Sequence, residues 1–295
     1  MTLDAPTVDI PLLEGLRDIA RNYDAILCDV WGVIHNGERA HPRALDAVRR
    51  YRDGGGCVLL FSNAPRLNAY ARMSLEALGA GGDLYDGVVT SGDVTLEALA
   101  SGRLGRACFY LGPGHDRRFV EESNLNAVNE DAAEFILCVG LRDDEREKVE
   151  GYRPLLQRMA MRSVPMVCAN PDIIVERGEN LLPCAGALAR LYETLGGKVR
   201  YFGKPHKDIY LHAWKILEGK VGGILDKKRV LAVGDGIATD ILGARDFGID
   251  AVFITGGIAA LEVGDDAHTP SPQRLKRFYE AHNVQPVAAM AHLSW

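Results

Sequence analysis

Short apolar runs alternate with longer amphipathic segments along the first hundred residues of the chain. Such short runs between helical segments are typical of a parallel sheet that is covered by helices on both faces. The expected strands are residues 25–28, 57–61 and 88–90, and the expected helices are residues 42–53, 66–78 and 95–100. The pattern therefore predicts an α/β fold.

The same alternation returns later in the chain. There, helices are expected at 207–217 and 239–247 and strands at 229–233 and 251–254. Between the two blocks we expect strands at 108–111, 135–139 and 164–168 and helices at 116–122, 143–161 and 186–195. Residues beyond about 255 are weakly patterned apart from a helix at 272–282. A chain of 295 residues is comfortable for two units, so we expect the middle block to be inserted into a sheet built from both ends.

The composition indicates an ordinary globular protein, with 47% hydrophobic and 25% charged residues. The formal net charge of −6 and the lack of a Lys/Arg stripe argue against a polynucleotide partner. The N-terminal residues lack a basic flank followed by an apolar stretch, and no window reaches the ~20 apolar residues that cross a bilayer. We therefore expect a protein that is neither exported nor membrane-bound.

The six cysteines are widely spaced and form no C-x-x-C pair. Most lie in apolar runs, where cysteine usually packs as a small hydrophobic residue. They predict free thiols and a reducing, cytoplasmic location.

The first chemical candidate is Asp29, which follows the apolar run AILC in the stretch DVWGVIHNG. In open parallel sheets, ligands bind beyond the carboxyl ends of the strands, where Asp29 is expected. A carboxylate there can attack phosphorus or carbon, or coordinate a metal. The alternative is an aspartate that only caps the next loop.

Two further clusters offer donors for an anion. Ser62 and Asn63 end the apolar run of LLFSNAPR, before a helix begun by Pro65, and with its backbone donors they can hold a phosphoryl oxygen. Lys204 lies between Gly203 and Pro205, just before a helix, and can neutralise a phosphate or a carboxylate. A common strand-to-helix turn and a solvated surface lysine explain the same residues without a site.

The fourth cluster is acidic. Asp235 follows a glycine at the end of an expected strand, and Asp240 lies five residues later at a helix start. Two carboxylates in this arrangement suit an oxygen-ligated Mg²⁺. Asp240 alone is explained as an acid in the first turn of a helix, but packing gives no reason for a charge at Asp235.

In this order the four clusters resemble the motifs of the haloacid-dehalogenase-like superfamily: a nucleophilic Asp, a Ser or Thr, a Lys and an acidic metal pair. Similarity to its class IIA branch, which includes NagD-type, pyridoxal and phosphoglycolate phosphatases, lies in TSGDVTLEAL, ANPD, PCAGALARLYETLGG and GKP. The resemblance covers about residues 23–257. It implies a Rossmann-like parallel-sheet core at residues 1–103 and 201–295, with an α/β cap domain of the class IIA type inserted at residues 104–200.

The resemblance also implies roles for the catalytic residues. Asp29 would be the attacking carboxylate, Ser62 a donor to the transferring phosphoryl group, and Lys204 the charge that offsets both. Mg²⁺ would be bound by Asp29, the backbone carbonyl of Trp31 and Asp235, with Asp240 close behind. These roles are physically consistent, because phosphoryl transfer depends chiefly on positioning and charge neutralisation.

The same resemblance assigns residues near the substrate. Asn63 would help hold the phosphate pocket or the nucleophile loop. In the cap, Asp172 would lie near the substrate and residues 173–183 would line the leaving-group pocket. The alternative for Asn170 and Asp172 is that they only shape a turn.

Trp31 departs from the family pattern. Phosphatases of this superfamily carry a second Asp there, which protonates the leaving alcohol and then activates water. An indole does neither, and loss of such a group typically costs ~10²–10⁴ in rate. His35 is an alternative proton carrier, and an exposed loop histidine is the competing interpretation of it.

We therefore expect a Mg²⁺-dependent phosphatase of a small phosphorylated metabolite, such as a sugar phosphate, a nucleotide, or an aryl or acyl phosphate, with an aspartyl-phosphate intermediate. One alternative is a catalytically weakened protein that binds a phosphorylated ligand. Another is a carbon–halogen or other carbon-centred hydrolase, because haloacid dehalogenases carry an aromatic residue at this position and use no metal. The acidic pair favours the phosphatase, since like charges without a metal would raise one another's pKa. A homodimer is expected by analogy.

Overall fold

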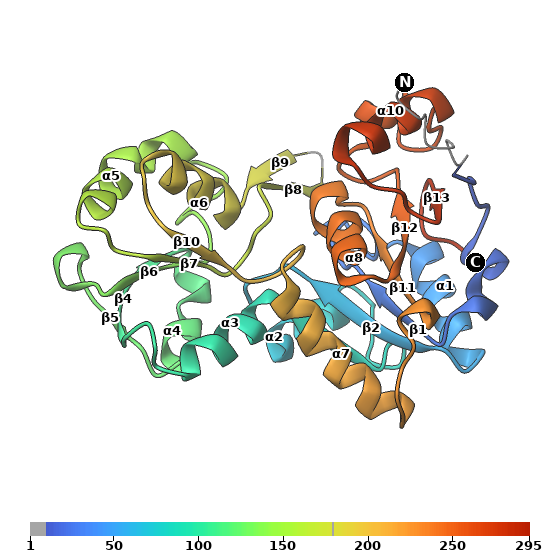
Figure 1. Cartoon of the computed structure of the whole chain (residues 1–295), viewed down its shortest axis with the longest axis horizontal. Helices are drawn as coiled ribbons and strands as arrows, with labels where there is room; N and C mark the ends of the chain where they lie inside the picture. The colour runs from blue at the N-terminus through green and yellow to red at the C-terminus, as the bar shows by residue number, and fades with distance from the viewer. Residues whose placement is uncertain (1–9, 179) are drawn as a thin grey trace, which may run out of the picture.

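The computed structural model describes residues 10–178 and 180–295, which form two parallel sheets and a β-hairpin (Figure 1). The first sheet has the order β13-β12-β11-β1-β2-β3 and the second has the order β10-β7-β6-β4-β5. The first contains β1 (Ala25–Cys28), β2 (Cys57–Ser62), β3 (Gly87–Thr90), β11 (Val230–Gly234), β12 (Asp250–Ile254) and β13 (Ala288–Met290). The second contains β4 (Ala107–Leu111), β5 (Asn126–Ala127), β6 (Phe135–Cys138), β7 (Met166–Cys168) and β10 (Val199–Tyr201). The antiparallel hairpin joins β8 (Ile174–Arg177) and β9 (Asn180–Pro183).

Helices follow most strands. Those in the first and last parts of the chain are α1 (Pro42–Asp53), α2 (Asn68–Ala77), α3 (Ser91–Ala100), α7 (Lys207–Val221), α8 (Leu242–Phe247), α9 (Ala260–Val263) and α10 (Pro272–His282). Those in the middle part are α4 (Arg118–Glu122), α5 (Arg153–Met161) and α6 (Ala185–Thr194). The 3-10 turns are η1 (Leu16–Asp18), η2 (Ala20–Asn22), η3 (Gly114–Asp116), η4 (Glu130–Ala132), η5 (Val149–Tyr152) and η6 (Lys227–Arg229), and η7 (Ile237–Ile241) is a π-helical turn.

The strands of the first sheet are mainly apolar because both of their faces are buried, and their polar residues Ser62, Thr90 and Asp250 lie at strand ends. In β1, Ile26 packs in the same cluster as Val48 of α1, whereas Leu27 packs in the same cluster as Leu217 of α7. Successive side chains of a strand point to opposite faces, so each strand supplies both layers. This burial fixes the strands side by side and brings their carboxyl ends to one edge.

The second sheet is built from the chain between α3 and α7, which confirms the predicted α/β fold with a Rossmann-like core and a cap. Figure 1 shows the two sheets in separate lobes, with the β8–β9 hairpin between them. One apolar cluster runs through both lobes, since it contains Phe61 of β2, Leu99 of α3 and Phe135 of β6. The domain bounds, residues 1–103 and 201–295 for the core and 104–200 for the cap, remain a prediction.

Several expected helix starts were wrong: the helix expected from residue 95 begins at Ser91, and the helix expected from residue 239 begins at Leu242 after a π-helical turn. The helix expected from residue 143 begins near Arg153, because the Asp143 carboxylate accepts the backbone N–H groups of Glu145 and Arg146 and holds that segment as a turn. The helix expected from residue 66 begins at Asn68, whose N–H donates to Asp93 at 3.0 Å.

Several short strands were not anticipated from the sequence. They are β5, β8, β9, β10 and β13. The strand β13 has the sequence AAM, and alanine carries almost no strand preference. Each of these strands has at most four residues, too few to show a hydrophobic period.

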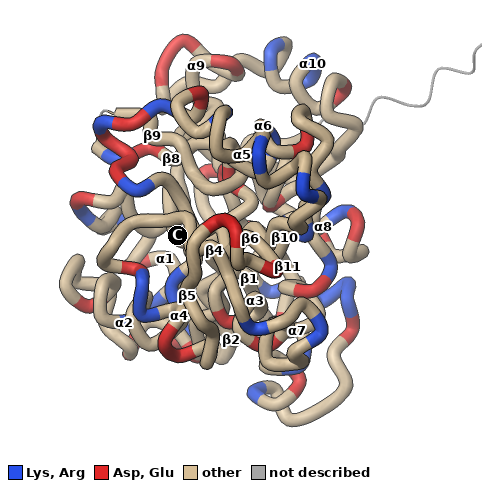
Figure 2. Tube along the Cα trace, turned by 90° about the vertical axis from the view of Figure 1, so that its left-hand side faces the viewer, with Lys and Arg blue, Asp and Glu red and all other residues tan. Residues whose placement is uncertain are grey.

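The structure agrees with the prediction of free thiols, since all six cysteines are unpaired and only Cys57 is partly exposed. The N-terminal segment was predicted to carry no export signal. Its residues 1–9 lie outside the described residues. In residues 10–178 and 180–295 no helix has the length and apolarity required to cross a membrane. Figure 2 shows basic and acidic residues interspersed along the trace, and the absence of a nucleic-acid partner remains a prediction.

The helix α7 offers a matched test of the core. Leu217 is fully buried, whereas Leu211 on the same helix is 49% exposed. We expect Leu217→Ala to lower the free energy of unfolding by about 2–5 kcal/mol, because the removed side chain leaves a cavity. Leu211→Ala should cost less than about 1 kcal/mol. Urea unfolding measures both losses, and equal losses would contradict the assigned packing.

Candidate active site

Asp29 lies at the carboxyl edge of the first sheet, directly after β1. Its backbone N–H donates to the carbonyl of Val233 at 2.8 Å, so the ladder between β1 and β11 continues one residue beyond the strand. Asp235 follows β11 on the neighbouring strand. Because the strands are parallel and paired in this register, both carboxylates emerge at the same edge, as the sequence predicted.

Ser62 ends β2, the neighbour of β1 on the other side. Its Oγ accepts the N–H of Ala64 at 3.1 Å, which leaves the hydroxyl proton free to donate. The expected helix start next to Ser62 is absent from the described chain, because α2 begins only at Asn68. The expected helix start at Pro65 is therefore wrong, whereas anion binding by Ser62 and Asn63 remains a prediction.

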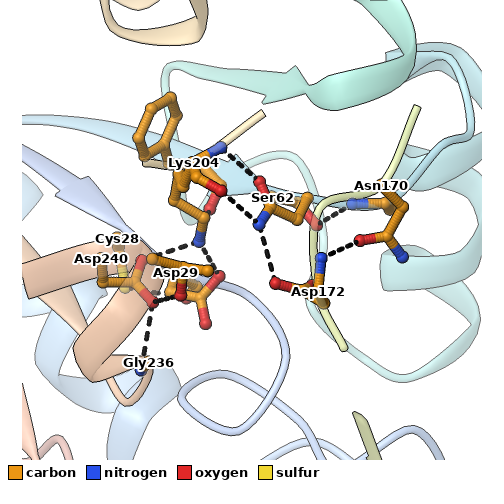
Figure 3. Close-up of polar contacts among 12 residues, drawn as sticks. Cys28, Asp29, Ser62, Asn170, Asp172, Lys204, Gly236 and Asp240 are labelled. Atoms are coloured by element: carbon orange, nitrogen blue, oxygen red, sulfur yellow. Dashed lines mark hydrogen bonds and ion pairs between the residues drawn. The ribbon is translucent and has the colours of Figure 1, made fainter. Parts of the chain in front are cut away.

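Lys204 is buried, with 2% of its surface exposed, so the interpretation as a solvated surface lysine is wrong. Its ammonium nitrogen donates to Asp29 Oδ1 at 2.5 Å, to Asp240 Oδ1 at 2.7 Å and to the backbone carbonyl of Phe61 at 2.9 Å (Figure 3). An ammonium group has three N–H donors, so this set uses all of them. Lys204 therefore fixes both carboxylates relative to the end of β2.

Asp240 lies in the π-helical turn η7 rather than in a regular helix. Its Oδ2 accepts from the backbone N–H of Gly236 at 3.2 Å and from the Thr239 hydroxyl at 3.3 Å. Both of its oxygens therefore have a donor, since Oδ1 binds Lys204. π-helical turns are rare and often occur at functional sites.

Asp235 is held from two sides. Its Oδ2 accepts the N–H of Ile258 at 3.0 Å, from the loop after β12. Gly32 approaches so closely that a Cβ there would lie 2.2 Å from the same oxygen, and its φ of +81° also favours glycine. Within residues 10–178 and 180–295, no donor bonds to Oδ1 of Asp235, which leaves this oxygen available to a cation.

The three carboxylates form one buried cluster. Asp29, Asp235 and Asp240 each offer an oxygen, and these oxygens lie within 4.8 Å of one another. Lys204 supplies one positive charge against three carboxylates, which leaves negative charge uncompensated in a buried site. Oxygen ligands with excess negative charge are those that Mg²⁺ or Ca²⁺ prefers, so the residues fit a divalent cation.

The pKa values of the cluster reflect this crowding. Burial, and then the nearby Asp240, raise the pKa of Asp29 well above its usual range, while Lys204 opposes the shift. Burial and Asp240 raise the pKa of Asp235 to about 7. Burial alone would lower the pKa of Lys204, but Asp240 and Asp29 outweigh it and the net pKa is raised. The lysine therefore stays charged, and a cation would favour ionised carboxylates.

Asn63 connects this edge to the second lobe. Its Nδ2 donates to Asp172 Oδ1 at 2.7 Å, and its Oδ1 accepts the backbone N–H of Lys204 at 2.6 Å. Asp172 is itself held in a turn, because its N–H donates to Asn170 Oδ1 at 3.0 Å. Burial raises the pKa of Asp172 to about 6. Asn170 and Asp172 thus shape a turn, and the same turn brings the Asp172 carboxylate to Asn63 at the site.

Trp31 and His35 lie on the loop after Asp29. Their rings meet edge to face, with centroids 5.0 Å apart. His35 Nδ1 accepts the N–H of Gly37 at 2.9 Å, and burial lowers the pKa of His35 to about 4. His35 is buried and neutral near pH 7, so it is neither an exposed loop residue nor a ready proton donor. The Trp31 indole N–H donates to the backbone carbonyl of Glu176 in β8.

Some supporting groups had no distinct sequence signal. The carbonyl of Phe61 and the N–H of Ile258 are backbone groups, which any residue provides. The pair Gly256 and Gly257 after β12 was a usable hint, because glycine at a strand end often marks a close approach of the chain. The contact between Trp31 and Glu176 spans 145 residues and was not foreseeable from local patterns.

Comparison with protein families and known structures gives consistent results. The family model for haloacid dehalogenase-like hydrolases matches residues 23–248. A hydrolase of the haloacid dehalogenase-like family from Brucella suis is 41% identical and has a TM-score of 0.85, covering 96% of this chain and 100% of that chain. A possible sugar phosphatase from Cytophaga hutchinsonii has the same fold at 20% identity, with a TM-score of 0.79 over 97% of this chain and 100% of that chain.

A relative in the sequence comparison is the acid sugar phosphatase of Staphylococcus aureus. It is 26% identical over 196 residues, which cover 66% of this chain and 71% of the relative. The sequence and the structure comparison therefore both include proteins described as sugar phosphatases.

The raised pKa of Asp235 predicts how stability varies with pH when metal is removed. An acid whose pKa is higher in the folded protein than in the unfolded chain loses stability as pH rises between the two values. In EDTA, we expect the free energy of unfolding to fall from about pH 4 to about pH 7, the folded pKa of Asp235. Asp235→Asn should make this fall shallower by on the order of 1–3 kcal/mol.

Urea unfolding at pH 5 and pH 8 measures this difference. The fall should not vanish in Asp235→Asn, because the pKa of Asp29 is also raised. A matched control is Asp246→Asn, since the side chain of Asp246 on α8 is 53% exposed. An identical pH dependence in Asp235→Asn and the wild type would contradict the proposed environment.

Proposed function

This chain belongs to the haloacid dehalogenase-like hydrolases, and from that membership we propose that it is a Mg²⁺-dependent phosphatase of a small phosphorylated metabolite. The observation that carries the proposal is the bonding of Lys204 to Asp29 and Asp240 beside Asp235. A buried ammonium among three carboxylates has little structural value by itself, because the charges must be desolvated. Phosphoryl transfer, in contrast, requires a fixed nucleophile and concentrated positive charge.

Asp29 is the proposed nucleophile. Among the described donors Lys204 bonds to Oδ1 alone, which orients the carboxylate and favours its ionised form, while Oδ2 is left to attack. A bond forms from the Asp29 oxygen to phosphorus as the bond from phosphorus to the leaving oxygen breaks. Water then attacks the aspartyl phosphate, releases phosphate and regenerates Asp29.

Ser62, Asn63 and Lys204 are the proposed phosphate-binding residues. The hydroxyl proton of Ser62 is free, so it can donate to a phosphoryl oxygen. Asn63 bonds both the backbone of Lys204 and the carboxylate of Asp172, which ties the end of β2 to the cap. Preorganised donors of this kind stabilise developing negative charge at no cost of reorganisation.

Mg²⁺ would be held by Asp29, Asp235, the backbone carbonyl of Trp31 and, close behind, Asp240. When bound, such an ion neutralises charge on the phosphoryl oxygens. Among the described residues, no donor occupies Asp235 Oδ1, so this oxygen is open to the ion. The gathering of the three carboxylates within 4.8 Å supports this assignment.

The substrate class is proposed from the cap and from Trp31. Asp172 and residues 173–183 are the proposed leaving-group contacts, and the acid sugar phosphatase relative supports a sugar phosphate. Because Trp31 carries no titrating group and His35 is neutral, the leaving oxygen should depart with little protonation. A sugar phosphate esterified at its anomeric carbon belongs to the class that the relative suggests. It also has a leaving group that needs little protonation, since the anomeric hydroxyl is more acidic than that of an ordinary alcohol. A homodimer and a cytoplasmic location remain predictions.

A panel of phosphate esters tests the function. With Mg²⁺, we expect the purified protein to release phosphate from at least one member and to lose that activity in EDTA. Asp29→Asn should lower kcat by about 10³-fold or more, because the nucleophile is lost. The control Asp246→Asn should keep the activity of the wild type. Full activity of Asp29→Asn would exclude the proposed mechanism.

Two outcomes of the same panel favour the alternatives. Saturable binding of phosphorylated ligands without turnover would identify a catalytically weakened binding protein. Trp31 is the residue that suggests this alternative. Turnover of 2-haloacids that EDTA does not reduce would identify carbon-centred hydrolysis. In either case the proposed phosphatase function would be wrong.

The missing proton carrier predicts a strong dependence on the leaving group. We expect kcat/KM for p-nitrophenyl phosphate to exceed that for an alkyl phosphate by about 10² or more, because general acid catalysis typically contributes ~10²–10⁴. His35→Gln should leave this ratio unchanged. A selective collapse of alkyl phosphate turnover in His35→Gln would show instead that His35 carries the proton.

A further inference from the structure

The β8–β9 hairpin of the cap lies against the loop that follows the proposed nucleophile. The indole N–H of Trp31 donates to the backbone carbonyl of Glu176, in the middle of β8. A second bond runs in the opposite direction, from the N–H of Gly178 to the carbonyl of Asn36 at 3.1 Å. Two hydrogen bonds thus join the loop 31–36 to a segment more than 140 residues later in the chain.

The tryptophan is held on its own side. Its ring packs edge to face on His35, with centroids 5.0 Å apart, and His35 is only 6% exposed. The backbone of the loop is closed by bonds from Gly32 N–H to the His35 carbonyl at 2.8 Å and from His35 N–H to the Val30 carbonyl at 3.1 Å. The indole therefore presents its N–H from a fixed position, two residues after Asp29.

The hairpin is likewise anchored in the cap. Arg177, next to Glu176, makes an ion pair with Asp144 at 2.9 Å, and both side chains are 35% exposed. At the other end, the N–H of Cys184 donates to the carbonyl of Ile173 at 2.9 Å and closes the base of the hairpin. A bond from Trp31 to the hairpin is therefore a bond from the nucleophile loop to the cap.

We propose that Trp31 is a positioning residue that clamps the β8–β9 hairpin over the nucleophile loop. An aspartate at this position is too short to bridge to Glu176, and its carboxylate would face a carbonyl oxygen with no proton between them. A tryptophan reaches the hairpin and donates. Residue 31 thus sets the closed position of the cap, and a leaving group must fit beneath the clamped hairpin.

The clamp is tested without catalysis, by hydrogen exchange of the hairpin amides measured by mass spectrometry. Trp31→Phe keeps the aromatic contact with His35 but removes the donor. A single hydrogen bond contributes ~1 kcal/mol, so exchange in residues 174–183 should rise about five-fold. The matched control is Trp214→Phe on α7, which removes an indole bond to Glu218 at 3.0 Å and should leave the hairpin unchanged.

A second variant tests the same contact from the cap side. Gly178 has a φ of +59°, a backbone conformation that an L side chain rarely adopts, so an alanine there strains the backbone that donates to Asn36. Gly178→Ala should therefore also speed exchange in the hairpin. Unchanged exchange in both Trp31→Phe and Gly178→Ala would overturn the clamp.

The kinetic consequence rests on the proposed phosphatase function. Trp31→Phe should raise KM for a sugar phosphate several-fold with a smaller change in kcat, because substrate must now close a looser cap. A general structural defect would instead lower the fraction of active enzyme and kcat alone, and that result would argue against the clamp. Faster hairpin exchange in a protein whose wild type turns over no phosphate ester would support the clamp and reject the function.

Discussion

The ammonium of Lys204 is the interaction on which the site depends, because its three hydrogen bonds join three separate parts of the chain. It binds Asp29 after β1, Asp240 after β11 and the carbonyl of Phe61 in β2. A buried ammonium is stable only when every proton has an acceptor and when nearby carboxylates offset its charge. The same carboxylates would repel one another without it. Neither the buried ammonium nor the buried carboxylates would be stable without the other. The site therefore forms only when the strands, the π-helical turn and the residues after β10 are all in place.

The parallel sheet makes this convergence possible. Strands that are buried on both faces must be apolar along their length, so polar groups are confined to their ends. Parallel pairing then collects those ends at one edge, where Asp29, Ser62 and Asp235 emerge from adjacent strands. Lys204 arrives from outside the sheet, directly after β10 returns the chain from the second lobe. The site is therefore shared between the sheet and the connection to the cap.

The sequence predicted the elements with a long periodic pattern and missed short strands and helix starts that side-chain hydrogen bonds determine. Long periodic segments such as α1 and α10 were placed with the right bounds, and the polar residues after the apolar strands of the core, taken as site candidates, lie together at one edge of the sheet. The hairpin β8–β9 was missed, since its strands are short and their side chains lie partly exposed between two lobes. The late start of α2 was missed as well, because it depends on Asp93, twenty-five residues further along the chain.

Trp31 shows how one residue connects chemistry and architecture. At a position two residues after the nucleophile, a side chain can reach either the reacting group or the cap, but a single side chain cannot serve both. A carboxylate there would move a proton and leave the hairpin free, whereas the indole bonds the hairpin and carries no exchangeable acid near neutral pH. Under the proposed function, a chain that uses this position for the cap acts on substrates whose leaving group needs little protonation. The choice at residue 31 therefore restricts both the closed shape of the site and the chemistry that the site can perform.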